Sequence, residues 1–72
     1  MEINDYVIGQ WLKGKRLEKK YSTRYVAEKL GYSSGMPTLW ENGKRSMSAK
    51  TFMDYCHLLG ADPQEFIDSL GK

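Results

Sequence analysis

Apolar residues recur along this chain at intervals of three and four, which is the spacing of one face of an α-helix. In the first segment Ile8 and Leu12 lie four residues apart, and Arg16 continues the same row. The lysines of this segment fall on other faces, so residues from about 5 to 19 are predicted to form an amphipathic helix. This helix contains two glycines, Gly9 and Gly14. Each costs about 0.5 to 1 kcal/mol relative to alanine, so we expect tertiary packing to hold the helix together.

A second, shorter helix is predicted over residues 23–30. Ser22 precedes it and is a favourable N-cap, because its hydroxyl can accept a hydrogen bond from a backbone N–H of the first turn. Its apolar residues fall at helical spacing: Val26, Ala27 and Leu30. Gly31 supplies the permissive backbone that ends the helix.

A third helix is predicted over residues 34–42, after a tight turn. Ser33 offers its N-cap, and the helix is closed by Asn42 and Gly43. Pro37 is tolerated only in the first turn of a helix and biases Met36 away from the α region. The third helix is therefore predicted to be short or to begin irregularly.

Two further helices complete the pattern. Ser48 caps a fourth helix that ends at Gly60, and one face of it carries Phe52, Tyr55, Cys56 and Leu59. A cap, a first-position proline and a third-position acid then open a fifth helix: Asp62, Pro63 and Glu65. The apolar residues of this last helix are Phe66, Ile67 and Leu70.

These five helices predict a compact all-α fold. No strand pattern, repeat, low-complexity segment or long linker is present, so residues 1–72 are expected to form a single domain. A chain of 72 residues can bury one small core and no more. The residues predicted to share it are Ile8, Leu12, Val26, Ala27, Leu30, Trp40, Phe52, Cys56, Leu59 and Phe66.

The charges are segregated along the chain. Between Lys13 and Lys50 there are ten Lys or Arg and three acidic residues, a net charge of +7. The remaining residues carry one Lys and six acids, a net charge of −5. A run of charge can simply be a solvated face, but this basic block coincides with the second and third helices. That coincidence favours a polyanion as the binding partner.

Cysteine content and hydropathy indicate the compartment. Cys56 is the single cysteine, so no internal disulfide can form, and a lone cysteine in an apolar helical pattern is usually a buried small side chain. No apolar run approaches a membrane span, and the acidic N-terminal residues do not match a signal peptide. We expect a soluble cytoplasmic protein with no membrane partner.

The stretch from Ser22 to Arg45 has two short helices joined by a tight turn and ends in Glu-Asn-Gly-Lys-Arg. It resembles the helix-turn-helix of Cro and cI-type phage repressors, the XRE-like family, and the resemblance extends over residues 8 to 70. It implies a lambda-repressor-like fold and a transcriptional regulator that places its third helix in the major groove of double-stranded DNA. It also implies a homodimer, since one such domain reads a half-site of a symmetric operator.

The resemblance also implies roles for particular residues. Arg16 and Glu41 occupy the positions of a structural ion pair that ties the first helix to the recognition helix. Thr23 stands where the family usually has a phosphate-binding glutamine. The residues expected to contact DNA are Ser22, Thr23, Ser33, Ser34, Gly35, Thr38, Leu39, Asn42, Lys44 and Arg45. Of these, Lys44 and Arg45 are the best candidates for pure phosphate contacts, and Ser22 and Ser33 are expected to cap their helices as well.

The recognition helix departs from the family pattern. Its outward positions carry Ser34, Gly35, Thr38 and Leu39, where relatives have side chains able to make bidentate contacts with bases. Met36, Pro37 and Leu39 would then form an exposed apolar tip on this helix. Such a surface binds protein more often than it reads bases. An alternative function is therefore an antirepressor that grips a partner repressor through Gly35, Met36, Pro37 and Leu39. A third is an antitoxin or a subunit of a larger regulatory complex.

Other chemistries find little support in the sequence. His57 is the only histidine and stands beside the only cysteine, far short of the ligands of a structural zinc site. No acid lies beside a His, Cys or Lys in a recognisable catalytic arrangement. We therefore expect no enzyme activity, no metal and no cofactor.

Overall fold

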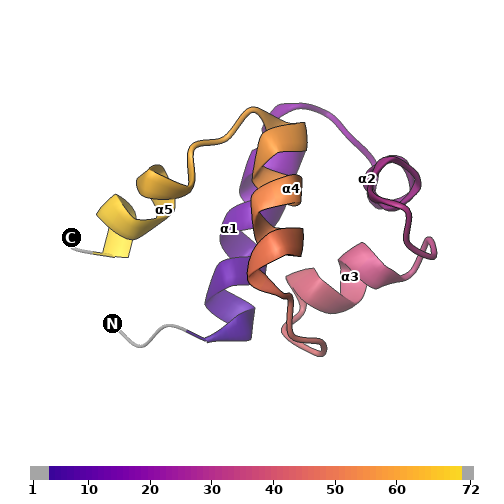
Figure 1. Cartoon of the computed structure of the whole chain (residues 1–72), viewed down its shortest axis with the longest axis horizontal. Coiled ribbons are helices and arrows are strands. Elements are labelled where there is room, and N and C mark those ends of the chain that lie inside the picture. Colours follow the sequence, from indigo (N-terminus) through magenta and orange to yellow (C-terminus); the bar gives the residue numbers. More distant parts are fainter. Residues whose placement is uncertain (1–3, 71–72) are drawn as a thin grey trace.

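The computed structural model describes residues 4–70, which form five α-helices and no strand (Figure 1). The helices are α1 (Asp5–Glu18), α2 (Thr23–Leu30), α3 (Met36–Glu41), α4 (Ala49–Leu59) and α5 (Pro63–Leu70). The predicted all-α fold is confirmed, and the predicted bounds agree closely except at the start of α3. Within the described residues, none of the helices has the length and apolar character of a membrane span.

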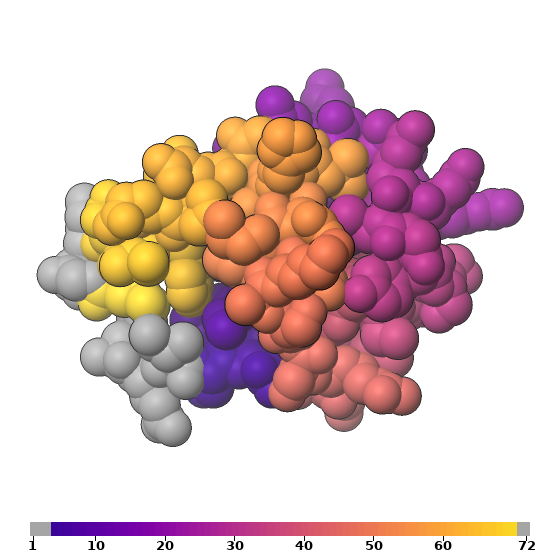
Figure 2. Space-filling view, viewed as in Figure 1, coloured from indigo at the N-terminus to yellow at the C-terminus, as the bar shows by residue number. Residues whose placement is uncertain are grey.

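Helices α1 and α4 pack against each other in the middle of the molecule (Figure 1). Helices α2 and α3 pack together on one side, where α2 also contacts α4 and α3 also contacts α1. Helix α5 lies on the other side (Figure 1). The surface in Figure 2 has the same order, with α4 between α5 and the segment that contains α2 and α3.

Four helices end in the same hydrogen-bond pattern, in which a residue one or two positions past the helix adopts a positive φ and the next N–H bonds back to a carbonyl of the last turn. At the ends of α2, α3 and α4 this residue is a glycine, as expected from the sequence: Gly31, Gly43 and Gly60. At the end of α1 it is Lys20, with a φ of +61°. The N–H of Lys20 bonds to the carbonyl of Leu17, and the N–H of Tyr21 to that of Arg16.

The N-cap of α3 differs from the prediction. Ser22 and Ser48 cap their helices through their side chains, as expected. However, α3 begins at Met36 with Gly35 as its N-cap, and no side chain caps it. Ser33 contributes only its backbone carbonyl, which accepts a hydrogen bond from the N–H of Met36. The reason is Pro37, which must stand in the first turn and so moves the start of the helix past Ser33.

The core lies between α1, α2, α3 and α4. Its buried side chains are Leu12, Val26, Trp40, Tyr55, Cys56 and Leu59. Three residues predicted for the core lie half-buried at its edge: Ile8, Leu30 and Phe52. Phe66 is buried and packs against the rings of Trp11 and Phe52, which attaches α5 to the rest of the fold. The predicted core is therefore largely confirmed, and Trp11 is an apolar contact that the prediction omitted.

Gly9 allows α1 and α3 to pack closely, a role that its helix propensity does not indicate. A Cβ at Gly9 would collide with the backbone of Trp40 and Glu41, so α1 and α3 approach each other more closely than any side chain permits. The side chain of Gln10 uses this proximity, because its Nε2 donates to the carbonyl oxygen of Glu41 at 2.8 Å. The glycine that weakens α1 thus fixes the position of α3.

Candidate nucleic-acid interface

The centre of the candidate site is the helix-turn-helix formed by α2, the turn over residues 31–35, and α3. The turn starts at Gly31, whose φ of +81° favours glycine, and the N–H of Tyr32 bonds to the carbonyl of Ala27 at 2.8 Å. Helix α3 then begins at Met36, with Pro37 in its first turn. The result is a short helix whose inner face is buried and whose outer face is open to solvent.

A buried ion pair attaches α3 to α1. The Nε of Arg16 lies 2.7 Å from one carboxylate oxygen of Glu41, and a second guanidinium nitrogen donates to the other oxygen at 3.1 Å. The two side chains are 9% and 5% exposed. Such a bidentate pair fixes the orientation of both groups as well as their distance. The hydrogen bond from Arg16 to this carboxylate raises the pKa of the guanidinium.

Tyr55 extends this ion pair to α4. Its hydroxyl donates to Glu41 at 2.9 Å, and Arg16 also donates to the backbone carbonyl of Tyr21 at 2.7 Å. Burial, reinforced by the Glu41 carboxylate, raises the pKa of the Tyr55 phenol well above its ordinary value. We call Arg16, Glu41 and Tyr55 the buried network. It joins α1, α3 and α4, so the last turn of α3 is held from two directions.

Trp40 is the main apolar contact between α3 and the core. Its indole packs edge to face on the ring of Tyr32, with 4.9 Å between the ring centroids, and lies 6.0 Å from the ring of Tyr55. Only 3% of Trp40 is exposed. The buried network and Trp40 together leave α3 little freedom to tilt relative to the rest of the molecule.

The residues predicted to contact DNA all reach the surface at or beside the helix-turn-helix. The exposed ones are Ser22, Ser33, Ser34, Gly35, Thr38, Asn42, Lys44 and Arg45. Thr23 and Leu39 are half-buried. The Ser22 hydroxyl already accepts the N–H of Tyr25 at 3.0 Å, so its structural role is the cap of α2.

The α3–α4 loop presents two positive charges beside α3. Lys44 and Arg45 are exposed, and neither takes part in an ion pair within residues 4–70, whereas Lys15 and Lys50 are paired with Glu65 and Asp54. The loop is held in place on both sides of these charges. Gly43, with a φ of +71°, packs directly on the backbone of Tyr6, and the Ser46 hydroxyl donates to Asp5 at 2.7 Å.

The apolar tip expected for the alternative, protein-binding function is largely absent. Pro37, in the first turn of α3, is fully buried. Met36 is half-buried and packs against the core. Of the residues expected to form that surface, Gly35 has no side chain, and Met36 and Leu39 each present only part of an apolar side chain to solvent.

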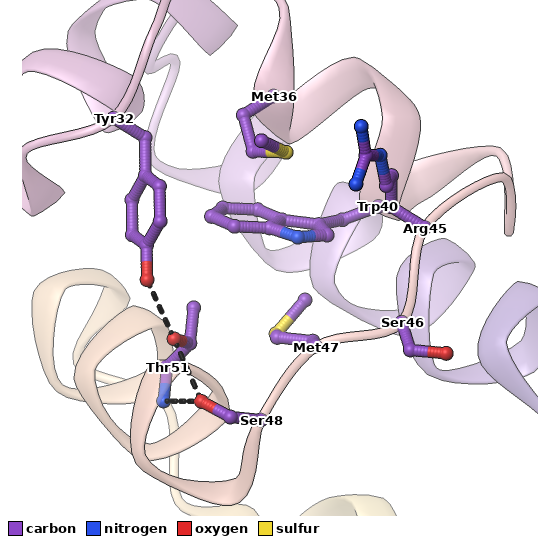
Figure 3. A pocket seen from close by; sticks show the side chains of 8 residues that line it. All are labelled: Tyr32, Met36, Trp40, Arg45, Ser46, Met47, Ser48 and Thr51. Atoms are coloured by element: carbon purple, nitrogen blue, oxygen red, sulfur yellow. Dashed lines mark hydrogen bonds between the residues drawn. The ribbon is translucent and has the colours of Figure 1, made fainter.

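Tyr32, Met36 and Met47 form a feature that the sequence did not indicate. Together with Trp40 they surround a pocket beside α3 (Figure 3). Periodicity could not identify it, because these residues come from the end of α2, from α3 and from the following loop. Among the described residues, no group of three or more His, Cys, Asp or Glu side chains is arranged to hold a metal ion.

Comparison with known proteins supports the fold. No protein-family model matches the chain, and no curated protein sequence matches it. A solved structure, that of the clp gene regulator ClgR from C. glutamicum, matches with a TM-score of 0.84 and 25% sequence identity. The match covers 93% of this chain and 87% of that chain. The chain therefore has the fold of this gene regulator over almost the full length of both.

Proposed function

We propose that this protein is a DNA-binding transcriptional regulator of the Cro/cI type. The observation that carries the proposal is α3, whose outer face is open to solvent and whose inner face is fixed by the buried network and Trp40. A recognition helix must be held rigidly, because base contacts depend on the position of each side chain. The structural likeness to a gene regulator supports the same function.

In this proposal α3 enters the major groove. Ser34 and Thr38 face base edges, where their hydroxyls can donate or accept, and Leu39 contacts a thymine methyl group. Lys44 and Arg45 contact phosphates on the adjacent backbone, assisted by polar groups at the helix ends: Ser22, Thr23, Ser33 and Asn42. A homodimer places two such helices on the two halves of a symmetric operator.

The alternative function is an antirepressor that binds a partner repressor. Burial of Pro37 and partial burial of Met36 and Leu39 reduce the apolar surface on which that function was based. Parts of Met36 and Leu39 are what remains of it, and two half-buried apolar side chains fall short of the apolar core of a specific protein interface. DNA is accordingly the preferred partner.

A fluorescence polarisation titration at two salt concentrations tests the proposal. The probes are random duplex DNA and duplexes from the genomic neighbourhood of the protein's own gene. We expect the affinity for DNA to fall as the salt concentration rises. Lys44→Ala or Arg45→Ala should reduce the slope of log K against log salt by about one and should lower the affinity for all DNA sequences equally. Lys15→Ala is the matched control, because Lys15 is paired with Glu65 of α5, and it should leave the slope unchanged.

Two results would count against the proposal. Absence of binding to every duplex at low salt would exclude a DNA-binding function. Equal slopes for Arg45→Ala, Lys44→Ala and the wild type would show that the α3–α4 loop does not face DNA.

A further inference from the structure

The pocket beside α3 has a volume of about 250 Å³ and predominantly apolar walls. In Figure 3 the indole of Trp40 lies between the side chains of Met36 and Met47, with the ring of Tyr32 to one side. Thioether groups adapt to the shape of a bound molecule and make favourable contacts with aromatic rings. Pockets for drug-sized ligands have volumes of about 300 to 1,000 Å³, so this one suits a smaller molecule.

The hydroxyl groups of the pocket are already hydrogen-bonded, those of Tyr32, Ser48 and Thr51 to one another and that of Ser46 to Asp5. The Tyr32 hydroxyl lies 2.8 Å from Oγ1 of Thr51, and Ser48 donates to the same oxygen at 2.9 Å. Oγ of Ser48 in turn accepts the N–H of Thr51 at 3.1 Å (Figure 3). These groups form a satisfied polar edge to the pocket and have little remaining capacity to bind a ligand.

Arg45 is the exception among the polar groups that line the pocket. Its side chain forms no ion pair or hydrogen bond with any of residues 4–70, and no Asp or Glu is among the lining residues. The pocket therefore combines an apolar interior with one uncompensated guanidinium. A ligand that complements it has an apolar body and one negative charge.

We propose that this pocket binds a small molecule with a flat apolar body and a single carboxylate. The body lies against Met36, Met47 and the ring of Tyr32, where it replaces water, and Trp40, only 3% exposed, supports these side chains from within. The carboxylate pairs with Arg45, whose planar guanidinium matches a carboxylate with two parallel hydrogen bonds. Cationic molecules are excluded by the same charge.

One consequence rests on the proposed function. Arg45 is also a proposed phosphate contact, so a carboxylate that occupies its guanidinium competes with the DNA backbone. Coupling between two ligands is reciprocal, so the small molecule weakens DNA binding by the same factor by which DNA weakens binding of the small molecule. The pocket is then an effector site that releases the regulator from DNA.

The test uses 1-naphthoate as the probe, with 1-naphthamide and inorganic phosphate as its neutral and purely anionic counterparts. Binding is followed by ¹H–¹⁵N chemical shifts of the full chain, including the indole N–H of Trp40. We expect saturable shifts confined to the lining residues. The affinities for the amide and for phosphate should be at least about tenfold lower, since the amide lacks the carboxylate and phosphate lacks the apolar body. Shifts elsewhere, no saturable binding, or equal affinity for phosphate would overturn the proposal.

Arg45→Gln and Lys44→Gln form a matched pair of variants. Each removes one positive charge from the same exposed loop, but only Arg45 lines the pocket. Arg45→Gln should weaken 1-naphthoate binding at least about tenfold, and Lys44→Gln by less than about threefold. Equal effects of the two variants would mean that net charge, rather than the pocket, attracts the anion.

Measurements of DNA binding test the ligand site and the regulator function separately. Saturating 1-naphthoate should reduce the DNA affinity of the wild-type protein and leave that of Arg45→Gln unchanged. If the probe binds in the pocket but no DNA binds, the ligand site stands and the regulator function fails. If DNA binds and the probe does not, the ligand site fails and the regulator function stands.

Discussion

Lys20 ends α1 in a backbone conformation that glycine adopts at the ends of α2, α3 and α4. Its φ of +61° costs an ordinary L-residue about 1 to 2 kcal/mol, because Cβ approaches the following carbonyl oxygen. Lys20→Gly should therefore raise the free energy of unfolding by about 0.5 to 1 kcal/mol, after the added flexibility of the unfolded chain is counted. Urea unfolding followed by tryptophan fluorescence measures this.

Gly43→Ala is the converse substitution. It introduces a side chain at a φ of +71°, and the new Cβ would lie 2.9 Å from Cα of Tyr6. It should destabilise the protein, and by more than Lys20→Gly stabilises it. A destabilising Lys20→Gly would show that Lys20 makes a contact in solution that offsets its backbone strain.

Two buried groups at the residue scale make stability depend on alkaline pH. Burial raises the pKa of the Cys56 thiol from 9.0 to about 11, and it raises the pKa of the Tyr55 phenol above its ordinary value of 10.0. In the unfolded chain both groups ionise at their ordinary pKa and so lose protons first. Stability should be fully present below about pH 9 and decline above it, by at most about 1.4 kcal/mol per pH unit for each group.

Urea unfolding at pH 8, 9.5 and 10.5 checks this prediction. Cys56→Ala should lower stability at every pH, since it removes a buried side chain, but it should also flatten the decline between pH 9 and 11. If the free energy of unfolding of this variant falls with pH as steeply as that of the wild type, ionisation of Cys56 does not contribute to the pH dependence.

At the scale of single elements, α3 shows where sequence reasoning succeeds and where it stops. Helical spacing was sufficient to assign Trp40 to the core, and the backbone rules for proline were sufficient to predict a short helix. Burial of Pro37 was not accessible to those rules, because it depends on how α3 lies against the other helices. The close approach at Gly9 was missed for the same reason, since propensity counts only the local cost of a glycine.

Trp40→Ala tests the attachment of α3 to the core. Truncating a large buried aromatic side chain costs about 3 to 5 kcal/mol, so the free energy of unfolding should fall by this amount. Trp11→Ala is the matched control, because Trp11 is half-buried and packs against Phe66 of α5 and Phe52 of α4, and it should cost less. Unfolding curves from circular dichroism give both values, and an unchanged curve for Trp40→Ala would contradict the core position of this residue.

At the scale of the whole molecule, part of the segregation of charge along the sequence becomes a segregation in space, although Lys15 of the basic block pairs with Glu65 of α5. Helix α5 lies on the opposite side of α1 and α4 from the helix-turn-helix (Figure 1). It contains Glu65 and Asp68, and Asp62 directly precedes it. Such an asymmetric field orients a protein as it approaches a polyanion. The sequence predicted the two blocks of charge, but their separation follows from the packing of Phe66 on Trp11, which no helical pattern specifies.

Leu39→Arg decides between DNA and a protein as the main target of α3. The added cation lies on the outer side of a rigidly held helix, so in a DNA-binding regulator it should keep or strengthen non-specific affinity and change sequence preference, since arginine pairs with guanine. In an antirepressor the same cation would stand unpaired in an apolar contact and abolish binding of the partner.

The variant is therefore measured twice, against DNA and against candidate repressors from the same genome. The matched control is Leu39→Met, which keeps an apolar side chain of similar size and should preserve whichever interaction the wild type has. Because Pro37 is buried and Met36 is half-buried, we expect Leu39→Arg to shift operator preference and lose no partner. Loss of a repressor complex by Leu39→Arg, with that complex intact in Leu39→Met, would transfer the function of α3 from DNA to protein.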